Sequence, residues 1–149
     1  MELAAWCDFR IAGRSASFGA FNRRWGVPFI DGGTWRFAAQ MGLGNALYVV
    51  ETGARLSAEQ AQRFGFVQEI VEDGEALDRA FAIAEVIANY PQGSLKADRA
   101  SVLDGVGRPR SDALEREAEM GRRALSDPAL QAGLESFVRG IRPAPPKAR

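Results

Sequence analysis

The pattern of the chain changes near residue 72, and this change limits the folds that are open to it. Before that point, short apolar segments alternate with glycine- and proline-containing loops and short helical segments. After it, the segments indicate helices joined by loops. This order predicts an α/β class in which a mixed core, residues 1–90, is followed by a helical region, residues 91–149, that ends in the flexible, proline-rich tail IRPAPPKAR.

The mixed core opens with two segments that predict strands. The first, LAAWCDFRIA at residues 3–12, is dense in apolar and aromatic side chains, and Asp8 and Arg10 stand at its wetter end. The second, ASFGAFN, covers residues 16–22. The loop RRWGVPFIDGGT follows and leads into a helix that begins near Thr34.

The rest of the core has clear helix ends. Gly42 and Gly53 follow two helical segments in the place of a C-terminal cap. Ser57 and Gln60 have the spacing of a capping box, which predicts a short helix ending at Gly65. The alternation in FVQEIV then predicts a short strand.

The helices at the end of the core and in the helical region offer candidate buried residues. One helix places Leu77, Phe81, Ala84 and Ile87 on one side. A later helix offers Leu114, Met120 and Leu125 as buried candidates, and a last helix begins at Pro128 and ends at Gly140.

Composition excludes several classes of function. Lys+Arg and Asp+Glu both number 19, so the chain has no net positive charge that would favour binding to nucleic acid or to an anionic membrane. No apolar run approaches the roughly 20 residues that span a bilayer. A secretory signal is not expected, because the first residues lack a basic segment followed by an apolar segment and a small-residue cleavage site, and a single cysteine suits a cytoplasmic location. Because the chain has no histidine, any acid–base chemistry must use Asp, Glu, Lys, Tyr or Cys7, and no metal site is expected. Cys7 is expected to be a small buried hydrophobe.

Four stretches together resemble the crotonase superfamily, the enoyl-CoA hydratase/isomerase family, in its carboxy-terminal half. MELAAWCDFRIA is similar to the family's Gly-Gly-x-x-Glu-Leu-Ala…Cys-Asp-x-x-x-Ala strand, and SASFGAFNRRWGVPFIDGGT is similar to its Ala-x-Phe-Gly…Gly…Pro…Gly-Gly-Thr loop. VETGARLSAEQAQRFGFVQEIV resembles the family's Leu-Thr-Gly…Gly-Leu-Val segment, and LQAGLESFV resembles its Glu-Gly-x-x-Ala-Phe helix.

The resemblance implies a partial crotonase-like ββα spiral followed by helices that mediate a homotrimer or hexamer. It implies an acyl-CoA thioester as substrate, with coenzyme A as part of the substrate and no separate cofactor. The implied activity is that of an enoyl-CoA hydratase, in which carboxylates transfer protons while backbone N–H groups stabilise an enolate. The alternatives are an enoyl-CoA isomerase, which needs one carboxylate, and a truncated oligomerisation module without a complete site.

The same resemblance implies the catalytic candidates. Glu2 matches the family's first catalytic glutamate, although by itself it also fits a solvated terminus. Asn22 stands where the family has its second glutamate, and an amide cannot take up or supply a proton at neutral pH; Asn22 also fits a polar loop residue. Asp31 is our candidate for the replacement carboxylate, paired with Glu2, and it also fits a turn or cap.

Substrate-binding candidates lie in the loop and in the last helix: Trp25, Phe29, Gly32 and Phe137. Trp6 and Trp35 are expected in the core or at subunit contacts. Since family members have an additional amino-terminal half, the glycines and one oxyanion donor implied by the family would precede Met1.

Overall fold

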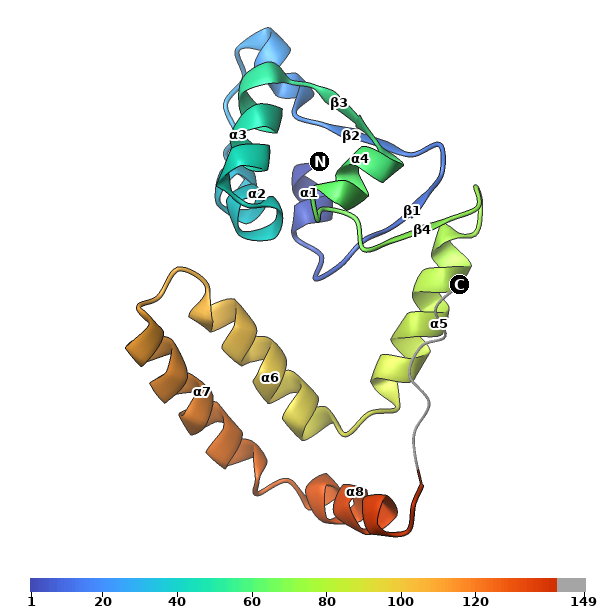
Figure 1. Ribbon diagram of the computed structural model, residues 1–149, viewed down its shortest axis with the longest axis vertical. Coiled ribbons are helices and arrows are strands. Elements are labelled where there is room, and N and C mark those ends of the chain that lie inside the picture. The colour runs from blue at the N-terminus through green and yellow to red at the C-terminus, as the bar shows by residue number, and fades with distance from the viewer. Residues whose placement is uncertain (142–149) are drawn as a thin grey trace. The chain divides into compact units, whose positions relative to one another are not determined.

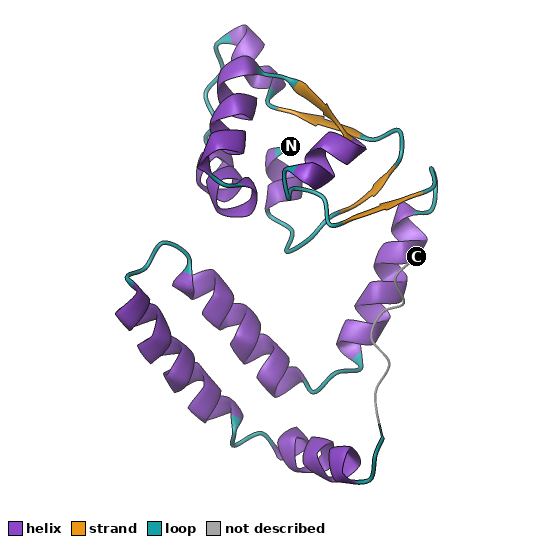
Figure 2. Cartoon of the chain, viewed as in Figure 1, coloured by secondary structure: helices purple, strands orange, loops and turns teal. Residues whose placement is uncertain are grey.

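The computed structural model describes residues 1–141, which form two compact units, Met1–Phe81 and a unit that begins at Ala82 (Figure 1). The division falls inside one helix, α5 (Ala76–Ala88), before residue 90, where the sequence predicts the boundary. Within residues 1–141, all strands precede residue 72 and only helices follow (Figure 2). The predicted order of a mixed part followed by helices alone is therefore confirmed.

Two strand pairs organise the first unit. The elements of this unit follow in the order α1 (Glu2–Ala5), β1 (Ile11–Gly13), β2 (Ser17–Gly19), the 3-10 helix η1 (Phe21–Trp25), α2 (Gly33–Met41), α3 (Leu43–Thr52), β3 (Arg55–Ser57), α4 (Ala58–Arg63) and β4 (Glu69–Val71). Strand β1 pairs in parallel with β4, so that Ile11 lies opposite Glu69, and β2 pairs antiparallel with β3, so that Phe18 lies opposite Leu56. The helix α4 packs against β2, β3 and β4, and α2 packs against both α1 and α3.

The first predicted strand is wrong over most of its length. Residues 2–5 form the one-turn helix α1, a turn follows, and the strand β1 begins only at Ile11. The apolar side chains within residues 3–12 have no regular spacing that would distinguish a buried strand from a short helix. Arg10, placed at the wetter end from sequence, is 7% exposed, while Cys7, expected to be buried, lies exposed in the turn after α1.

The predicted helix ends at Gly42 and Gly53 are confirmed, whereas α4 ends at Arg63, two residues before the predicted Gly65. Gly42 ends α2, and Gly53 ends α3 with a φ of 60°, a left-handed conformation that favours glycine. The capping box at the start of α4 is complete, because the Ser57 Oγ accepts a hydrogen bond from the Gln60 N–H and the Gln60 side chain accepts one from the Ser57 N–H.

Four phenylalanines form the centre of the core in the first unit. Phe66 meets Phe18 edge to face at 5.3 Å between ring centroids and Phe37 at 6.1 Å, and Phe37 meets Phe29 at 5.6 Å. Phe37 lies on α2 and Phe18 on β2, while Phe66 and Phe29 lie in the segments that precede β4 and α2. Burial of these rings joins the helices to the strands.

The second unit consists of helices with little burial. Its elements after α5 are α6 (Gln92–Gly105), α7 (Arg110–Ala124) and α8 (Pro128–Val138). Pro128 is the first residue of α8, as predicted, and Asp127 caps that helix by accepting a hydrogen bond from the Ala129 N–H. In α6 and α7, the Asp104 carboxylate pairs with the Arg116 guanidinium and joins the two helices.

None of residues 82–141 is buried within this chain. Leu114 and Leu125 are exposed and Met120 is half-buried, so the prediction that these three residues are buried is wrong for the chain by itself. Leu77 and Phe81 of α5 are exposed too. Spacing that gives a helix an apolar side does not by itself bury that side, because burial needs a second surface to cover it. None of the helices within residues 1–141 combines the length and the hydrophobicity that crossing a bilayer requires.

Candidate functional site

The carboxylate of Glu2 is held at the beginning of α2. Glu2 opens α1, and its Oε1 accepts a hydrogen bond of 3.0 Å from the backbone N–H of Gly33, the first residue of α2. The first N–H groups of a helix have no acceptor within the helix, and the positive end of the helix dipole favours an anion there. A carboxylate 31 positions away in the sequence thus serves as the acceptor.

The double glycine makes this approach possible. Gly32 has a φ of 78°, in the left-handed region that favours glycine. Gly33 has no such strain, but a Cβ at this position would lie 2.5 Å from the Glu2 Oε1 and 2.6 Å from its Cγ. The pair therefore allows the chain to turn and then allows the carboxylate to reach the helix.

The backbone of Asp31 is bonded to Trp6, the residue that follows α1. The Trp6 Nε1–H donates a hydrogen bond of 2.8 Å to the Asp31 carbonyl, and the Arg36 guanidinium stacks over the Trp6 ring at 3.6 Å from its centroid. The Asp31 side chain is exposed, and within residues 1–141 no hydrogen bond or ion pair joins its carboxylate to Glu2. The pairing of these two carboxylates stays a prediction.

Asn22 closes a loop. Its Nδ2 donates a hydrogen bond of 2.9 Å to the Val27 carbonyl, and the Val27 N–H donates one of 3.2 Å back to the Asn22 carbonyl. These bonds close the turn that follows η1. The described residues show no hydrogen bond between Asn22 and Glu2, so a role for Asn22 in catalysis stays a prediction.

The substrate-binding candidates differ in their surroundings. Trp25, at the end of η1, is 82% exposed, whereas Phe29 is half-buried against Phe37. Phe137 lies on α8, in the second unit, and is not placed relative to Glu2. Trp6 and Trp35 are each more than half exposed within this chain, so neither is a core residue.

Sequence reasoning missed the residue that holds α1 in place. The Arg10 guanidinium donates hydrogen bonds to the carbonyls of Cys7 (2.9 Å), Ala4 (3.2 Å) and Phe66, and it lies 4.6 Å from the centroid of the Phe66 ring. Burial lowers the pKa of this guanidinium, and the nearby Cys7 and Asp8 act in the opposite direction. A lone arginine in an apolar stretch was the only signal, and it does not identify its acceptors.

The profile of the family described as Enoyl-CoA hydratase/isomerase matches residues 1–144. The chain belongs to the enoyl-CoA hydratase/isomerase family. It is 35% identical over 118 residues to the probable enoyl-CoA hydratase 1, peroxisomal, of Arabidopsis thaliana, a match of 79% of this chain and 44% of that protein. It is 31% identical over 137 residues to the probable enoyl-CoA hydratase, mitochondrial, of Dictyostelium discoideum, a match of 92% of this chain and 50% of that protein. The chain thus spans about half the length of these two curated relatives.

Solved structures show the same family fold. The crystal structure of enoyl-CoA hydratase from Bacillus anthracis superposes with a TM-score of 0.89 at 28% identity, over 97% of this chain and 56% of that one. The crystal structure of a probable enoyl-CoA hydratase/isomerase from Mycobacterium abscessus gives a TM-score of 0.86 at 30% identity, over 99% of this chain and 56% of that one. The chain therefore has the α/β crotonase-like fold that its motifs predict.

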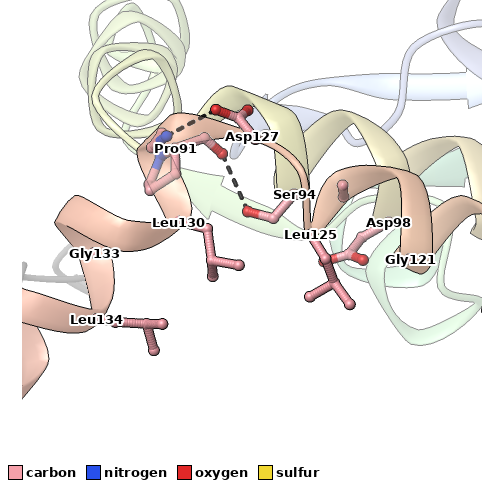
Figure 3. A pocket seen from close by; sticks show the side chains of 11 residues that line it. Pro91, Ser94, Asp98, Gly121, Leu125, Asp127, Leu130, Gly133 and Leu134 are labelled. Atoms are coloured by element: carbon pink, nitrogen blue, oxygen red, sulfur yellow. Dashed lines mark hydrogen bonds between the residues drawn. The ribbon is translucent and has the colours of Figure 1, made fainter.

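An opening in the second unit lies among α6, α7 and α8. It has a volume of about 320 Å³ and is lined mainly by apolar groups, including Leu125, Leu130 and Leu134 (Figure 3). Two of its polar groups are used at helix ends, since the Ser94 hydroxyl donates to the Pro91 carbonyl and Asp127 caps α8. No predicted site residue lines this opening. Within residues 1–141, no cluster of Cys, Asp and Glu has the composition to hold a metal ion.

Proposed function

We propose that this chain acts on acyl-CoA thioesters as an enoyl-CoA hydratase, with Glu2 as the group that transfers the proton. The relatives at 35% and 31% identity are named as enoyl-CoA hydratases, and the chain spans about half of each. The observation that carries the proposal is the Glu2 carboxylate held on the Gly33 N–H, at the position where the family motif has its first catalytic glutamate. A general acid or base needs a fixed position before it needs anything else.

The geometry suits one carboxylate that moves a proton beside a thioester carbonyl. The Oε1 of Glu2 accepts the hydrogen bond from the Gly33 N–H, and no residue within 1–141 donates a hydrogen bond to the Oε2 of Glu2. Oε2 can therefore take a proton from the carbon next to the thioester or from water, and return it later in the reaction. Asp31 is our proposed second carboxylate for the addition of water, and Trp25, Phe29, Gly32 and Phe137 are proposed to contact the acyl-CoA.

Asn22 favours a second candidate, an enoyl-CoA isomerase. The isomerase reaction moves one proton between two carbons and needs a single carboxylate. Asn22 is engaged with Val27 and carries an amide in place of a carboxylate, so Glu2 is the one position in the two glutamate motifs that can transfer a proton at neutral pH.

An absorbance assay separates the candidates. A hydratase removes the conjugated-enoyl absorbance of a 2-enoyl-CoA by adding water, whereas an isomerase creates that absorbance from a 3-enoyl-CoA. Glu2→Gln should lower the turnover by about 10²- to 10⁴-fold. Glu51→Gln, at an exposed position of α3, is the matched control and should leave turnover unchanged.

Two results would end the proposal. Equal turnover in Glu2→Gln and in the unchanged protein would remove Glu2 from the reaction. A purified protein that binds no acyl-CoA would leave the oligomerisation module as the remaining function.

Three finer proposals accompany the activity. We propose that the chain corresponds to the carboxy-terminal half of the family sequence, which its span of about half of its relatives supports. We propose a homotrimer or hexamer formed by the helical region, supported by the absence of any buried residue within 82–141. A cytoplasmic location is proposed on the single cysteine alone.

A further inference from the structure

Helix α1 is too short to fix the position of Glu2 by itself. It covers four residues, Glu2–Ala5, and its N-cap residue, Met1, offers no side-chain hydrogen bond. A single helical turn is unstable in isolation because it orders several backbone dihedrals for very few hydrogen bonds. Something outside α1 must therefore hold the helix that presents the Glu2 carboxylate to Gly33.

The end of α1 opposite to Glu2 is held by Arg10. Its guanidinium donates to the carbonyls of Ala4 and Cys7 at the end of α1 and to the carbonyl of Phe66 in the core. Ala4 lies in α1, where its carbonyl also accepts from the Cys7 N–H, and Cys7 follows the helix by two residues. Carbonyls at the end of a helix attract a cation. One rigid, planar group thus joins α1 to the segment that carries Phe66.

Arg10 is itself fixed by the strands. Its backbone N–H donates to the Gln68 Oε1 at 2.8 Å, and its carbonyl accepts from the Gln68 N–H at 3.0 Å, immediately before β1 pairs with β4. The side chain is 7% exposed and lies against the Phe66 ring, so its direction is set by packing. The guanidinium therefore has a defined position from which to hold α1.

We propose that Arg10 is a positioning residue for Glu2. By holding the far end of α1, Arg10 sets the contact between the Glu2 carboxylate and the Gly33 N–H. A helix rises about 1.5 Å per residue, so α1 is roughly 6 Å long, and a tilt of about 10° at its end moves Glu2 by about 1 Å. A displacement of that size breaks a hydrogen bond and lowers the rate of an oriented reaction by roughly 100-fold. The catalytic part of this inference rests on the proposed function; the structural part does not.

Hydrogen exchange of the Gly33 amide tests the structural part without substrate. This N–H has one acceptor, Glu2, so its exchange reports the contact directly. The Gly53 N–H, bonded to the Val49 carbonyl within the first unit, is an internal reference.

Arg79→Met is the matched control for Arg10→Met. Arg79 of α5 is about equally buried, at 8% exposure. Its guanidinium donates hydrogen bonds of 2.7 Å and 3.0 Å to the carboxylate of Glu69 in β4.

We expect exchange at Gly33, relative to Gly53, to become roughly 10- to 100-fold faster in Arg10→Met and to stay unchanged in Arg79→Met. Arg10→Lys keeps the charge and part of the hydrogen bonding, so it should recover part of the protection, and it also serves as the test variant if Arg10→Met does not fold. Unchanged relative exchange at Gly33 in whichever Arg10 variant folds overturns the proposal, as does an equal change in Arg79→Met.

Turnover separates this inference from the proposed function. In an active protein, we expect Arg10→Met to lower kcat by roughly 10- to 100-fold with little change in KM, because the substrate contacts are intact while Glu2 is displaced. A protein without turnover contradicts the proposed function, but the exchange result at Gly33 still decides the role of Arg10.

Discussion

Substitution of Gly33 by alanine perturbs the contact between Glu2 and α2 with little other change. The backbone of Gly33 is helical and its φ is not positive, so alanine fits the backbone. The added Cβ would lie 2.5 Å from the Glu2 Oε1, and the carboxylate has to retreat by roughly 1 Å before it reaches ordinary van der Waals contact. That retreat takes the 3.0 Å hydrogen bond beyond bonding distance.

Two opposing contributions set the magnitude. A hydrogen bond to a charged group contributes about 1.5–3 kcal/mol, and Glu2 is half-buried, which favours the lower end. Alanine in a helix gains up to about 1 kcal/mol over glycine. We therefore expect Gly33→Ala to lower the free energy of unfolding by about 0.5–2 kcal/mol, measured by urea denaturation.

Gly44→Ala is the matched control, because Gly44 lies in the first turn of α3 and nothing lies within 4 Å of its added Cβ. That variant should be as stable as the unchanged protein or more so, by up to about 1 kcal/mol. If Gly33→Ala proves as stable as Gly44→Ala, the close contact with Glu2 does not exist in solution, and the reasoning about the site fails. In an active protein, Gly33→Ala should also lose turnover while Gly44→Ala keeps it.

Two further predictions concern parts of the chain away from Glu2. Ser57→Ala removes the cap of α4 and should lower the free energy of unfolding by about 1 kcal/mol in urea denaturation; an unchanged midpoint would show that the capping box adds nothing. In the helical unit, hydrogen bonds from Arg108 and then Arg116 hold the pKa of Asp104 below its ordinary value of 3.8. The stability that this carboxylate contributes is therefore present above about pH 4 and is lost as the pH falls through the lowered pKa. Circular dichroism melts between pH 7 and pH 2 should show a smaller acid loss in Asp104→Asn than in the unchanged protein, and parallel losses would contradict the assignment.

Local signals in the sequence predict the ends of the elements well. Gly42, Gly53 and the capping box at Ser57 act within one helical turn, so a short window of sequence contains the whole cause. The segment at residues 2–10 fails for the opposite reason. Its conformation depends on the Gly33 N–H, the Phe66 carbonyl and the Gln40 side chain, which donates to the Ala5 carbonyl, and no local window contains them.

The candidate site was predictable only as a set of residues. The family motifs identify Glu2 and the double glycine, and the structure brings these together. The motifs place Asp31 beside them in sequence, but the structure uses its carbonyl and leaves its carboxylate exposed. Arg10 was not predictable as a partner of α1, because its acceptors are backbone carbonyls that carry no mark in the sequence.

The strand pairings have a consequence for the order in which the molecule folds. The hydrogen bond that starts the pairing of β1 with β4 joins residues 58 positions apart, and the Arg10 contact with Phe66 spans 56. Helices α2, α3 and α4 lie inside that interval and can form from local contacts, whereas the parallel pair must wait until a long loop has closed. Arg10 reaches the Phe66 carbonyl only at that late step, although its other acceptors, Ala4 and Cys7, are local. We therefore expect the Glu2 contact to be completed late in folding and to loosen in any state in which β4 has come away from β1.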